Sequence, residues 1–405
     1  MDRILIIGAG HAGGRLAQNL YDSNFEGEVL IFSDEKYLPY ERPPLSKSYL
    51  SNSKNIEDFT ILSKDIINQK NCSIFLDKKI YKIDFQNKKA IDFDGNTYKF
   101  SKIIFSNGAS PNKVNLKNAE TVNYLRTIDD SKKIRSNIGH INNLVILGAG
   151  FIGLEIAATV KSSYPDKKII VIDSSSSILG RNSNENIRNQ IYNLHHSKGI
   201  EFIFSNEILE IILNDKNQLN KIHLKQNIKI LSDMIIAGIG VRPNVDFISN
   251  SDIEIENGIK VNEYLETNIC DVYAIGDIAN FKSLFSNNFV REESWNNAEK
   301  QAFILSQNIL NNKIAYNEIP WFWTDQFNQN FQILGNINNF DKLYRRDYID
   351  NKFTEFYLQK NQIVGAFAQN MGRDIKIAKE IIKKNIYFDL DLLNDPNYNL
   401  KKILK

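Results

Sequence analysis

The stretch ILIIGAGHAG, residues 4–13, decides the fold of this chain. Its apolar run, Ile4–Ile7, predicts a strand, and the pattern over residues 15–21 predicts the helix that follows. Between the two lies G-x-G-x-x-G, in the strand, turn, helix order of a dinucleotide-binding turn. The sequence therefore predicts a Rossmann-like unit at its start.

Each glycine of this motif has a separate task. Gly8 permits the tight turn, Gly10 lets a pyrophosphate approach the backbone, and Gly13 lets the helix pack closely on the strand. A second apolar run, Val29–Phe32, is followed by Asp34, 21 residues after the last glycine of the motif. An acid at this distance can bind a ribose diol.

The arrangement is repeated in LVILGAGFIG, residues 144–153. A strand is again expected, at Ile169–Ile172, and Asp173 follows the motif by 20 residues. The two copies also end alike, with IIFSNGASPN at 103–112 and IIAGIGVRPN at 235–244. The glycines of the second copy are Gly148, Gly150 and Gly153. A duplication on this scale predicts two dinucleotide sites.

Two dinucleotides on one chain most simply mean a bound flavin and a visiting nicotinamide, with electrons passing between them. VYAIGDIANF, residues 272–281, supports this, because a strand runs into Gly276 and Asp277 and a helix is expected from about 295 to 310. An acid at the carboxyl end of a strand can accept hydrogen bonds from a ribityl or ribose hydroxyl.

Composition narrows the class of protein further. With 50 Lys and Arg against 48 Asp and Glu, the net charge of +2 gives no sign of a nucleic-acid or membrane-surface protein. The two cysteines, Cys72 and Cys270, lack disulfide or metal-ligand spacing, so no metal site is expected. The apolar run at the N-terminus is too short for a signal peptide and no later segment approaches a membrane span, which predicts a cytoplasmic protein.

YERPPLSK, residues 40–47, follows the first nucleotide-binding unit. Its two prolines are expected to exclude helix and to hold the charge of Lys47 in place. No cysteine lies between residues 1 and 71, so this segment has neither a redox dithiol nor a single sulfenic centre. Electrons would therefore leave the flavin directly, for an external acceptor.

These motifs together resemble the FAD-dependent NADH:ferredoxin and rubredoxin reductases, of putidaredoxin reductase type, which serve Rieske-type dioxygenases or cytochromes P450. LPYERPPLSK, GAGFIGLEIAA, AGIGVRPN, AIGDIANF, ESWNNA and FWTDQF occur in the family's order and span the chain. The resemblance implies an α/β fold of glutathione reductase type, with a C-terminal α+β domain. The implied domains are FAD-binding, 1–112 and 244–317; NAD-binding, 113–243; and C-terminal, 318–405.

The resemblance also implies the residues that bind each cofactor. For tightly bound FAD they are Gly8, Gly10, Ala12, Gly13, Asp34, Arg42, Lys47, Ile80, Arg126, Asp277, Trp295 and Trp323. For the nicotinamide dinucleotide they are Gly148, Gly150, Ile152, Gly153, Glu155, Asp173 and Gly240. Asn107 and Ser110 depart from the family's usual threonine and arginine, which puts local contacts at this domain boundary in doubt.

Lys47 and Glu155 are the implied catalytic pair: Lys47 near the flavin N5, and Glu155 paired with it and meeting the nicotinamide. Plainer alternatives remain open at this stage. Glu155 can be an acid in the first turn of its helix, favoured by the helix dipole. Lys47 can end a solvated loop. Trp321 and Trp323 are read first as packing aromatics.

Asp173 predicts NADH in preference to NADPH, because its charge repels a 2′-phosphate and Ser174–Ser177 supply no arginine. Arg181 is the nearest cation and leaves some NADPH use open. The expected partner is a small acidic iron-sulfur ferredoxin or rubredoxin, bound weakly and in a salt-dependent way. No nucleic acid or membrane is expected, and oligomeric state is open. The alternatives are a flavoenzyme reducing oxygen, quinone or another small acceptor, and a redox-sensing protein similar to apoptosis-inducing factor.

Overall fold

The computed structural model describes residues 2–67, 69, 71–180, 183–283 and 285–405. It divides into two compact units. The first comprises Met1–Pro43, Asn55–Ser110 and Val241–Glu318, and the second Pro44–Lys54, Pro111–Gly240 and Ile319–Lys405. The segment that carries Lys47 thus belongs to the second unit, together with both the predicted NAD-binding and C-terminal domains. The three-domain division remains a prediction.

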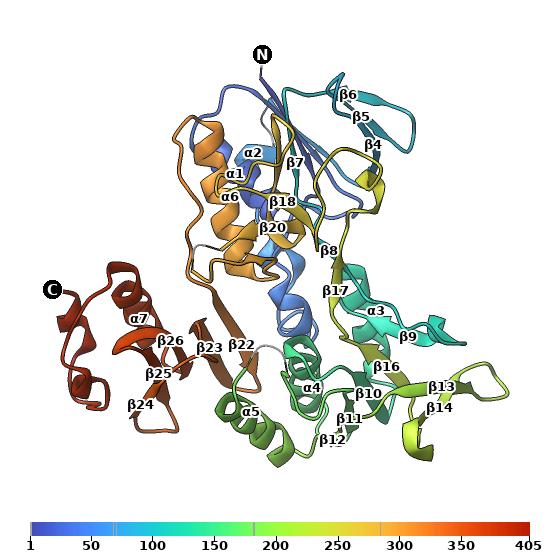
Figure 1. Ribbon diagram of the computed structural model, residues 1–405. Helices are drawn as coiled ribbons and strands as arrows, with labels where there is room; N and C mark the ends of the chain where they lie inside the picture. Colours follow the sequence, from blue (N-terminus) through green and yellow to red (C-terminus); the bar gives the residue numbers. More distant parts are fainter. Residues whose placement is uncertain (1, 68, 70, 181–182, 284) are drawn as a thin grey trace. The chain divides into compact units, whose positions relative to one another are not determined.

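The first unit is built on a sheet of five parallel strands. Their order is β19 (Val272–Ala274), β7 (Lys102–Phe105), β1 (Arg3–Ile7), β2 (Glu28–Phe32) and β3 (Cys72–Phe75). Helices α1 (His11–Asp22) and α6 (Trp295–Ile309) lie side by side next to this sheet (Figure 1). Strand β1 is almost wholly apolar because a parallel strand of this kind is covered on both faces.

The second unit contains a parallel sheet in which four strands repeat the order of the first sheet, while the fifth, β9 (Val122–Tyr124), precedes them in the chain. Its order is β12 (Glu201–Ile203), β11 (Lys168–Ile172), β10 (Asn143–Leu147), β16 (Met234–Ala237) and β9, all parallel. Its helices are α3 (Ile128–Ile138), α4 (Phe151–Ser163) and α5 (Glu185–Ser197). In each repeat, the strand that leads into the glycine turn lies in the middle of the sheet. Strand β1 lies between β2 and β7, and β10 lies between β11 and β16. The predicted duplication is therefore confirmed.

The C-terminal part of the second unit is an antiparallel sheet. Its order is β22 (Trp321–Gln326), β23 (Gln329–Gly335), β26 (Gln362–Gln369), β25 (Phe353–Gln359) and β24 (Lys342–Asp347). Helix α7 (Gly372–Lys384) packs on this sheet. One apolar core joins this sheet to helices α4 and α5, so the two parts of the unit share buried residues.

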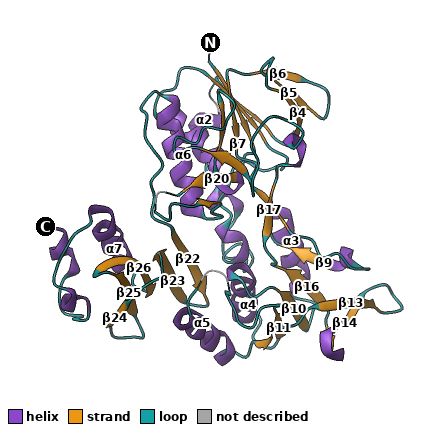
Figure 2. Cartoon of the chain, viewed as in Figure 1, coloured by secondary structure: helices purple, strands orange, loops and turns teal. Residues whose placement is uncertain are grey.

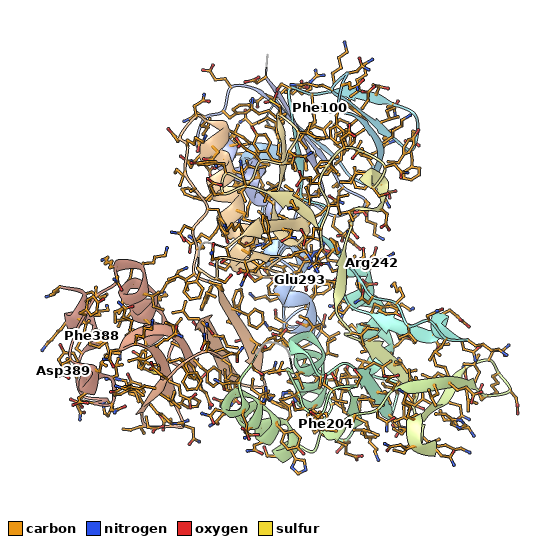
Figure 3. All side chains as sticks on the ribbon, in the orientation of Figure 1. Phe100, Phe204, Arg242, Glu293, Phe388 and Asp389 are labelled. Atoms are coloured by element: carbon orange, nitrogen blue, oxygen red, sulfur yellow. The ribbon has the colours of Figure 1, made fainter. Side chains whose placement is uncertain are left out.

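The remaining elements are small, and Figure 2 shows them among the helices and strands of a mixed α/β chain. Three small sheets contain β4 (Ile80–Asp84), β5 (Lys89–Asp92) and β6 (Thr97–Lys99); β13 (Ile208–Leu213), β14 (Leu219–Leu224) and β15 (Lys229–Leu231); and β18 (Ile259–Val261), β20 (Ala279–Lys282) and β21 (Phe289–Val290). Strand β8 (Ala109–Pro111) pairs with β17 (Val241–Pro243), and α2 covers Lys64–Ile67. Phe100, labelled in Figure 3, belongs to the core of the first unit.

Candidate functional site

Two of the three glycines in the first turn have no room for a side chain, and the third has room. Gly8 has φ +101°, and a Cβ there would lie 2.5 Å from the backbone of Asn107. A Cβ on Gly13 would lie 2.1 Å from the Gly8 carbonyl oxygen. At Gly10 the nearest atom to a Cβ would be Arg42 Nη2, 3.7 Å away. Space is thus left where a pyrophosphate must approach the backbone.

The start of helix α1 fits the same group. Gly10 is its N-cap, and no side chain among the described residues caps the first-turn amides. No acidic residue lies in that turn. Uncapped amides at a helix N-terminus bind anions, so the first turn fits the phosphates of a dinucleotide.

Arg42 stands beside this turn in a hydrogen-bonded group. Its Nη2 donates to Glu35 Oε1 at 2.9 Å and its Nη1 to the Tyr40 hydroxyl at 3.0 Å. The Tyr40 hydroxyl donates to Glu35 Oε2 at 2.5 Å. Burial alone would lower the pKa of Arg42, but its interactions with Tyr40, Glu35 and Asp277 outweigh burial and raise it. A permanent cation is therefore held near Gly10 by acidic neighbours.

Asp34, the predicted ribose acid, follows β2 and is exposed. The next residue, Glu35, is the acid that takes part in the Arg42 group. Sequence reasoning missed Glu35, although an acid directly after a predicted acid at a strand end was a visible signal.

Three further predicted FAD residues come together near the start of α1. A Cβ on Gly276 would lie 2.9 Å from Ala12 Cβ, so the residue directly before Asp277 lies against the first turn of this helix. Trp295 is the first residue of α6, and its ring lies 5.2 Å from the ring of His11. The expected helix start at residue 295 is confirmed.

The second glycine turn repeats the geometry of the first. Gly148 has φ +98°, a Cβ on Gly153 would lie 2.1 Å from the Gly148 carbonyl oxygen, and a Cβ on Gly150 would meet no atom within 4 Å. Gly150 caps α4 without a side-chain hydrogen bond. Asp173 Oδ2 accepts a hydrogen bond from the Ala149 amide at 2.6 Å. The second turn fits a dinucleotide on the same grounds as the first.

The predicted Lys47–Glu155 pair is present in the second unit. Lys47 Nζ lies 3.0 Å from Glu155 Oε1 and 3.3 Å from Asp325 Oδ2. Ser46 Oγ donates to Glu155 Oε2 at 2.6 Å, and Thr324 Oγ1 donates to Glu155 Oε1 at 2.7 Å. Glu155 is 3% exposed and Asp325 42%. The Lys47 ammonium is therefore shared between a buried carboxylate with three donors and an exposed one.

The segment Pro44–Lys54 is fixed to the rest of the second unit by hydrogen bonds and an apolar anchor. Ser131 Oγ donates to the Leu45 carbonyl at 2.9 Å, and Thr159 Oγ1 to the Ser46 carbonyl at 2.8 Å. Leu50 belongs to the core of this unit. Lys47 is accordingly a placed charge rather than the end of a solvated loop.

Two expectations about these residues are wrong. The prolines do not exclude helix, because Pro43–Ser46 form one turn of 3-10 helix; a first turn requires no donor from the residues that open it. Glu155 is not a first-turn acid: α4 begins at Phe151, its first turn contains no acid, and Glu155 is the fifth residue. Burial and three donors, not the helix dipole, account for its position.

The other predicted site residues are dispersed. Trp323 stacks on Trp321 at 5.3 Å, and Lys47 Nζ lies 5.8 Å from the Trp323 ring centroid. The Arg126 amide donates to Asp130 Oδ2 at 3.0 Å. Gly240 has φ +89°. Ile80 is buried at the start of β4, and Ile152 is 47% exposed on α4.

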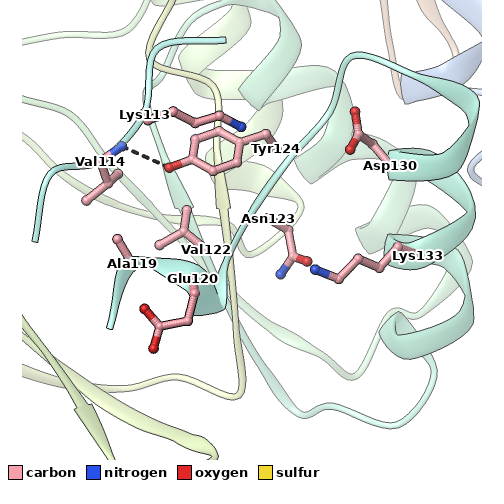
Figure 4. Close-up of a pocket in the computed structure, with 9 residues that line it drawn as sticks. All are labelled: Lys113, Val114, Ala119, Glu120, Val122, Asn123, Tyr124, Asp130 and Lys133. Atoms are coloured by element: carbon pink, nitrogen blue, oxygen red, sulfur yellow. Dashed lines mark hydrogen bonds between the residues drawn. The ribbon is translucent and has the colours of Figure 1, made fainter. Parts of the chain in front are cut away.

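Two hollows lie in the second unit. One, of about 210 Å³, adjoins the charged cluster and is lined by Lys47, Ser51, Ala158, Thr159, Ser162, Ser163, Asp325 and Phe327. The other, of about 440 Å³, lies beside β9 and the start of α3 (Figure 4). In it, the Tyr124 hydroxyl accepts a hydrogen bond from the Val114 amide at 2.8 Å, and Lys113 Nζ lies 3.6 Å from the Tyr124 ring centroid. None of its lining residues is a predicted site residue.

The described part of the chain holds no group of three or more His, Cys, Asp or Glu side chains that could bind a metal ion. It also has no helix long and apolar enough to cross a membrane. Burial raises the pKa of the Cys72 thiol to about 11, so this thiol is not a ready nucleophile. Arg181 lies outside the described residues.

With this geometry in view, comparison with known proteins defines the class. The pyridine nucleotide-disulphide oxidoreductase family matches residues 2–302, and a reductase C-terminal family matches residues 321–404. The chain belongs to the pyridine nucleotide-disulphide oxidoreductase family, which confirms the predicted α/β fold and the oxidoreductase class. Membership implies binding of FAD and NAD(H).

Two curated relatives from Pseudomonas putida match along nearly their whole length. The ferredoxin–NAD(+) reductase component of the p-cumate 2,3-dioxygenase system is 28% identical, covering 99% of this chain and 98% of that protein. Putidaredoxin reductase CamA is 28% identical, covering 100% and 97%. These relatives confirm the resemblance to ferredoxin reductases.

Solved structures agree. The covalent putidaredoxin reductase–putidaredoxin complex matches with a TM-score of 0.92 at 27% identity, covering 100% of this chain and 98% of that one. The ferredoxin reductase for the CYP199A2 system from Rhodopseudomonas palustris matches with a TM-score of 0.93 at 27% identity, covering 99% of each chain.

Proposed function

We propose that this protein is an NADH-dependent ferredoxin reductase, which passes electrons through FAD to a small iron-sulfur ferredoxin or rubredoxin that serves an oxygenase. The observation that carries the proposal is the full-length similarity to two proteins named as ferredoxin–NAD(+) reductase component and putidaredoxin reductase. A second observation agrees with it: no cysteine lies in residues 1–71, so the segment before Lys47 offers no thiol relay.

When bound, FAD supplies the exchange between a two-electron donor and one-electron acceptors. The residues of this chain bind and orient. The first glycine turn and the uncapped start of α1 offer amides to the pyrophosphate of FAD, with Arg42 as the nearby cation. Asp277 is proposed to accept a hydrogen bond from the ribityl chain. Trp295 and Trp323 are proposed to contact the flavin ring.

Lys47 and Glu155 are the proposed catalytic pair. Glu155 is buried, so its charge needs the donors that Ser46, Thr324 and Lys47 provide. This arrangement holds the Lys47 ammonium in one orientation, 3.0 Å from Glu155 Oε1. By resemblance, this ammonium would lie on the side of the flavin that takes up the hydride, where its positive charge would stabilise the negative charge of a reduced flavin.

The second glycine turn is the proposed NADH site, and Asp173 its specificity residue. Asp173 already accepts amide hydrogen bonds from Ala149 and Ser175, which fix the carboxylate at the strand end. A fixed negative charge there accepts a bond from an adenosine 2′-hydroxyl and repels a 2′-phosphate. NADH is accordingly preferred over NADPH.

The proposed partner is acidic and binds transiently, because electron-transfer partners use small interfaces steered by charge. A cytoplasmic location belongs to the same proposal, and cell fractionation tests it.

The deciding experiment is anaerobic stopped-flow reduction by NADH, followed by mixing with a [2Fe–2S] ferredoxin or a rubredoxin at low and at high salt. Reduction of the carrier within one turnover, slowed by salt, supports the proposal. Rapid turnover with oxygen or quinone, with no gain from added carrier, identifies a small-molecule reductase instead. Very slow transfer to every acceptor, together with an NADH-dependent oligomer size, identifies a redox sensor.

A further inference from the structure

A chain of buried hydrogen bonds begins at the Lys47–Glu155 pair and ends at a histidine with no assigned role. Thr324 Oγ1 lies 2.7 Å from Glu155 Oε1, and Gln326 Nε2 lies 2.8 Å from Thr324 Oγ1. His195 Nε2 lies 2.9 Å from Gln326 Oε1. His195 and Gln326 are 0% exposed and Thr324 is 1% exposed. Three elements of the second unit, α5, β22 and α4, are thus joined through side chains alone.

The donor and acceptor in each of these hydrogen bonds follow from Glu155. Glu155, with the Lys47 ammonium 3.0 Å from Oε1, is a carboxylate and can only accept, so the Thr324 hydroxyl donates to it. The Thr324 oxygen is then free to accept from the Gln326 amide N–H. The amide oxygen of Gln326 must therefore face His195, and Nε2 of His195 must carry the proton. Every donor points toward Glu155.

The surroundings of His195 agree with this tautomer. Its Nδ1 is buried and has no hydrogen-bond partner among the described residues, so a proton on Nδ1 would be left without an acceptor. The rings of Phe202 and Phe327 meet its ring edge-on at 6.3 and 5.1 Å. Phe204, labelled in Figure 3, stacks on Phe202 at 5.6 Å. Burial lowers the pKa of His195 to about 4, which keeps it neutral near pH 7.

We propose that His195 is a positioning residue for Glu155, acting through Gln326 and Thr324. The amide of Gln326 can be turned over with little steric change, since its nitrogen and oxygen have similar size. Turned over, it would offer its oxygen to the Thr324 hydroxyl, and Thr324 would then donate to Gln326 instead of Glu155. The Nε2–H of His195 prevents this, because this donor requires the amide oxygen of Gln326 as its acceptor and the amide N–H cannot replace it.

The consequence reaches Lys47. With Thr324 turned away, Glu155 keeps only Ser46 and Lys47 as donors, and the exposed Asp325 competes for the same ammonium at 3.3 Å. His195 therefore selects between two placements of Lys47, one on the buried acid and one on the exposed acid. This role adds a residue to the proposed function. Experiments that measure the rate of flavin reduction by NADH therefore rest on the proposed function.

The histidine tautomer is tested directly by NMR on the holoprotein with ¹⁵N-labelled histidine. The chain has 5 histidines, so a His195→Gln variant assigns the signal of His195 by its loss. We expect a neutral Nε2–H form that does not titrate between about pH 5 and 9, given its low pKa. A proton on Nδ1, or titration near neutral pH, would overturn the proposal. This measurement stands even if NADH is not the donor.

The functional test compares variants that keep or remove each donor. His195→Leu and Thr324→Val should each lower the limiting rate of flavin reduction by NADH about tenfold, with little change in the dissociation constant of NAD⁺. His195→Gln, which places an N–H near the lost Nε2, should recover most of the rate. The His195→Leu/Thr324→Val double variant should be no slower than the slower single variant, because both break one chain.

His196→Leu is the matched control. His196 is the next residue of α5, is exposed, and stacks on Tyr192 at 5.6 Å. It should leave the reduction rate unchanged. If His195→Leu lowers the melting temperature but not the reduction rate, or if the two single effects multiply, His195 is a packing residue only and the proposal fails.

Discussion

The two nucleotide-binding repeats share the order of four parallel strands but differ at the end of the second strand. In the second repeat the Asp173 amide donates to the Ile203 carbonyl, and in the first the Ser33 amide donates to the Phe75 carbonyl at the same point. Ser33, not Asp34, is thus the structural counterpart of Asp173, at 20 residues after the last glycine in each repeat. The duplicated pattern thus determines the backbone at the strand end. The position of the acidic side chain can still differ by one or two residues between the repeats.

The helices after the glycine turns differ as well. Two residues past the last glycine, the first repeat has Arg15 and the second has Glu155. Arg15 is 27% exposed and meets Glu299 at 2.9 Å and Glu41 at 3.3 Å. Glu155 is 3% exposed and holds Lys47. The same helix position is thus a partly solvated ion pair in one repeat and the centre of a buried network in the other.

The largest expected effect is the difference in stability between the alanine variants of Glu155 and Arg15. Glu155→Ala should lower the free energy of unfolding by about 3 kcal/mol, because it leaves buried donors without their acceptor. Arg15→Ala should cost about 1 kcal/mol or less, as partly exposed ion pairs do. Denaturant titration of the holoproteins measures both. Equal losses would contradict the contrast between the repeats.

A second pair of variants separates the two cofactors. Gly10→Ala and Gly150→Ala meet no protein atom closer than 3.7 Å, so both should fold. The added methyl groups occupy the approach of a pyrophosphate, and each should weaken its own dinucleotide by about tenfold to a hundredfold. Gly10→Ala should release FAD, seen by absorbance. Gly150→Ala should retain FAD and raise the dissociation constant of NADH. The reverse pattern would show that the repeats are assigned the wrong way round.

The glycine turns, the strands around them and the start of α6 were predictable because local sequence determines them. The network around Glu155 was not. Thr324, Gln326 and His195 lie 169, 171 and 40 residues from Glu155 along the chain, and no local pattern brings them together. The family resemblance pointed to Trp323 in the FWTDQF motif, while Thr324 beside it makes the contact to Glu155.

Local sequence left one choice open and misled at another point. An acid at the end of β2 was visible, but which of two adjacent acids turns inward depends on Arg42 and Tyr40. Pro43 and Pro44 were expected to exclude helix, yet they open a 3-10 turn, since a helical first turn tolerates residues without an amide proton.

A smaller effect is expected at the strand end of the second repeat. Asp173→Ser installs the residue that the first repeat carries at Ser33, so it fits this backbone. Loss of the charge should reduce the preference for NADH over NADPH by about tenfold. The ratio of kcat/KM for the two donors measures it. An unchanged ratio would remove Asp173 as the specificity residue.

The smallest expected effect concerns pH. Burial raises the pKa of Glu292, just before α6 in the first unit, to about 7 from 4.5, and Tyr316 is its near titratable neighbour. The folded state then holds a proton that the unfolded state has lost, so stability falls as pH rises from about 4.5 to 7. Glu292→Gln should raise the melting temperature more at pH 8 than at pH 5. An equal change at both pH values would contradict the shift.

The central claim is that electrons pass from NADH to a flavin without a protein thiol. Anaerobic titration of the holoprotein with NADH, before and after alkylation of Cys72 and Cys270 under denaturing conditions followed by refolding with FAD, tests it most directly. Full flavin reduction by one NADH per chain is expected in both samples. A requirement for two NADH per chain, or loss of reduction in the alkylated protein that still binds FAD, would contradict it.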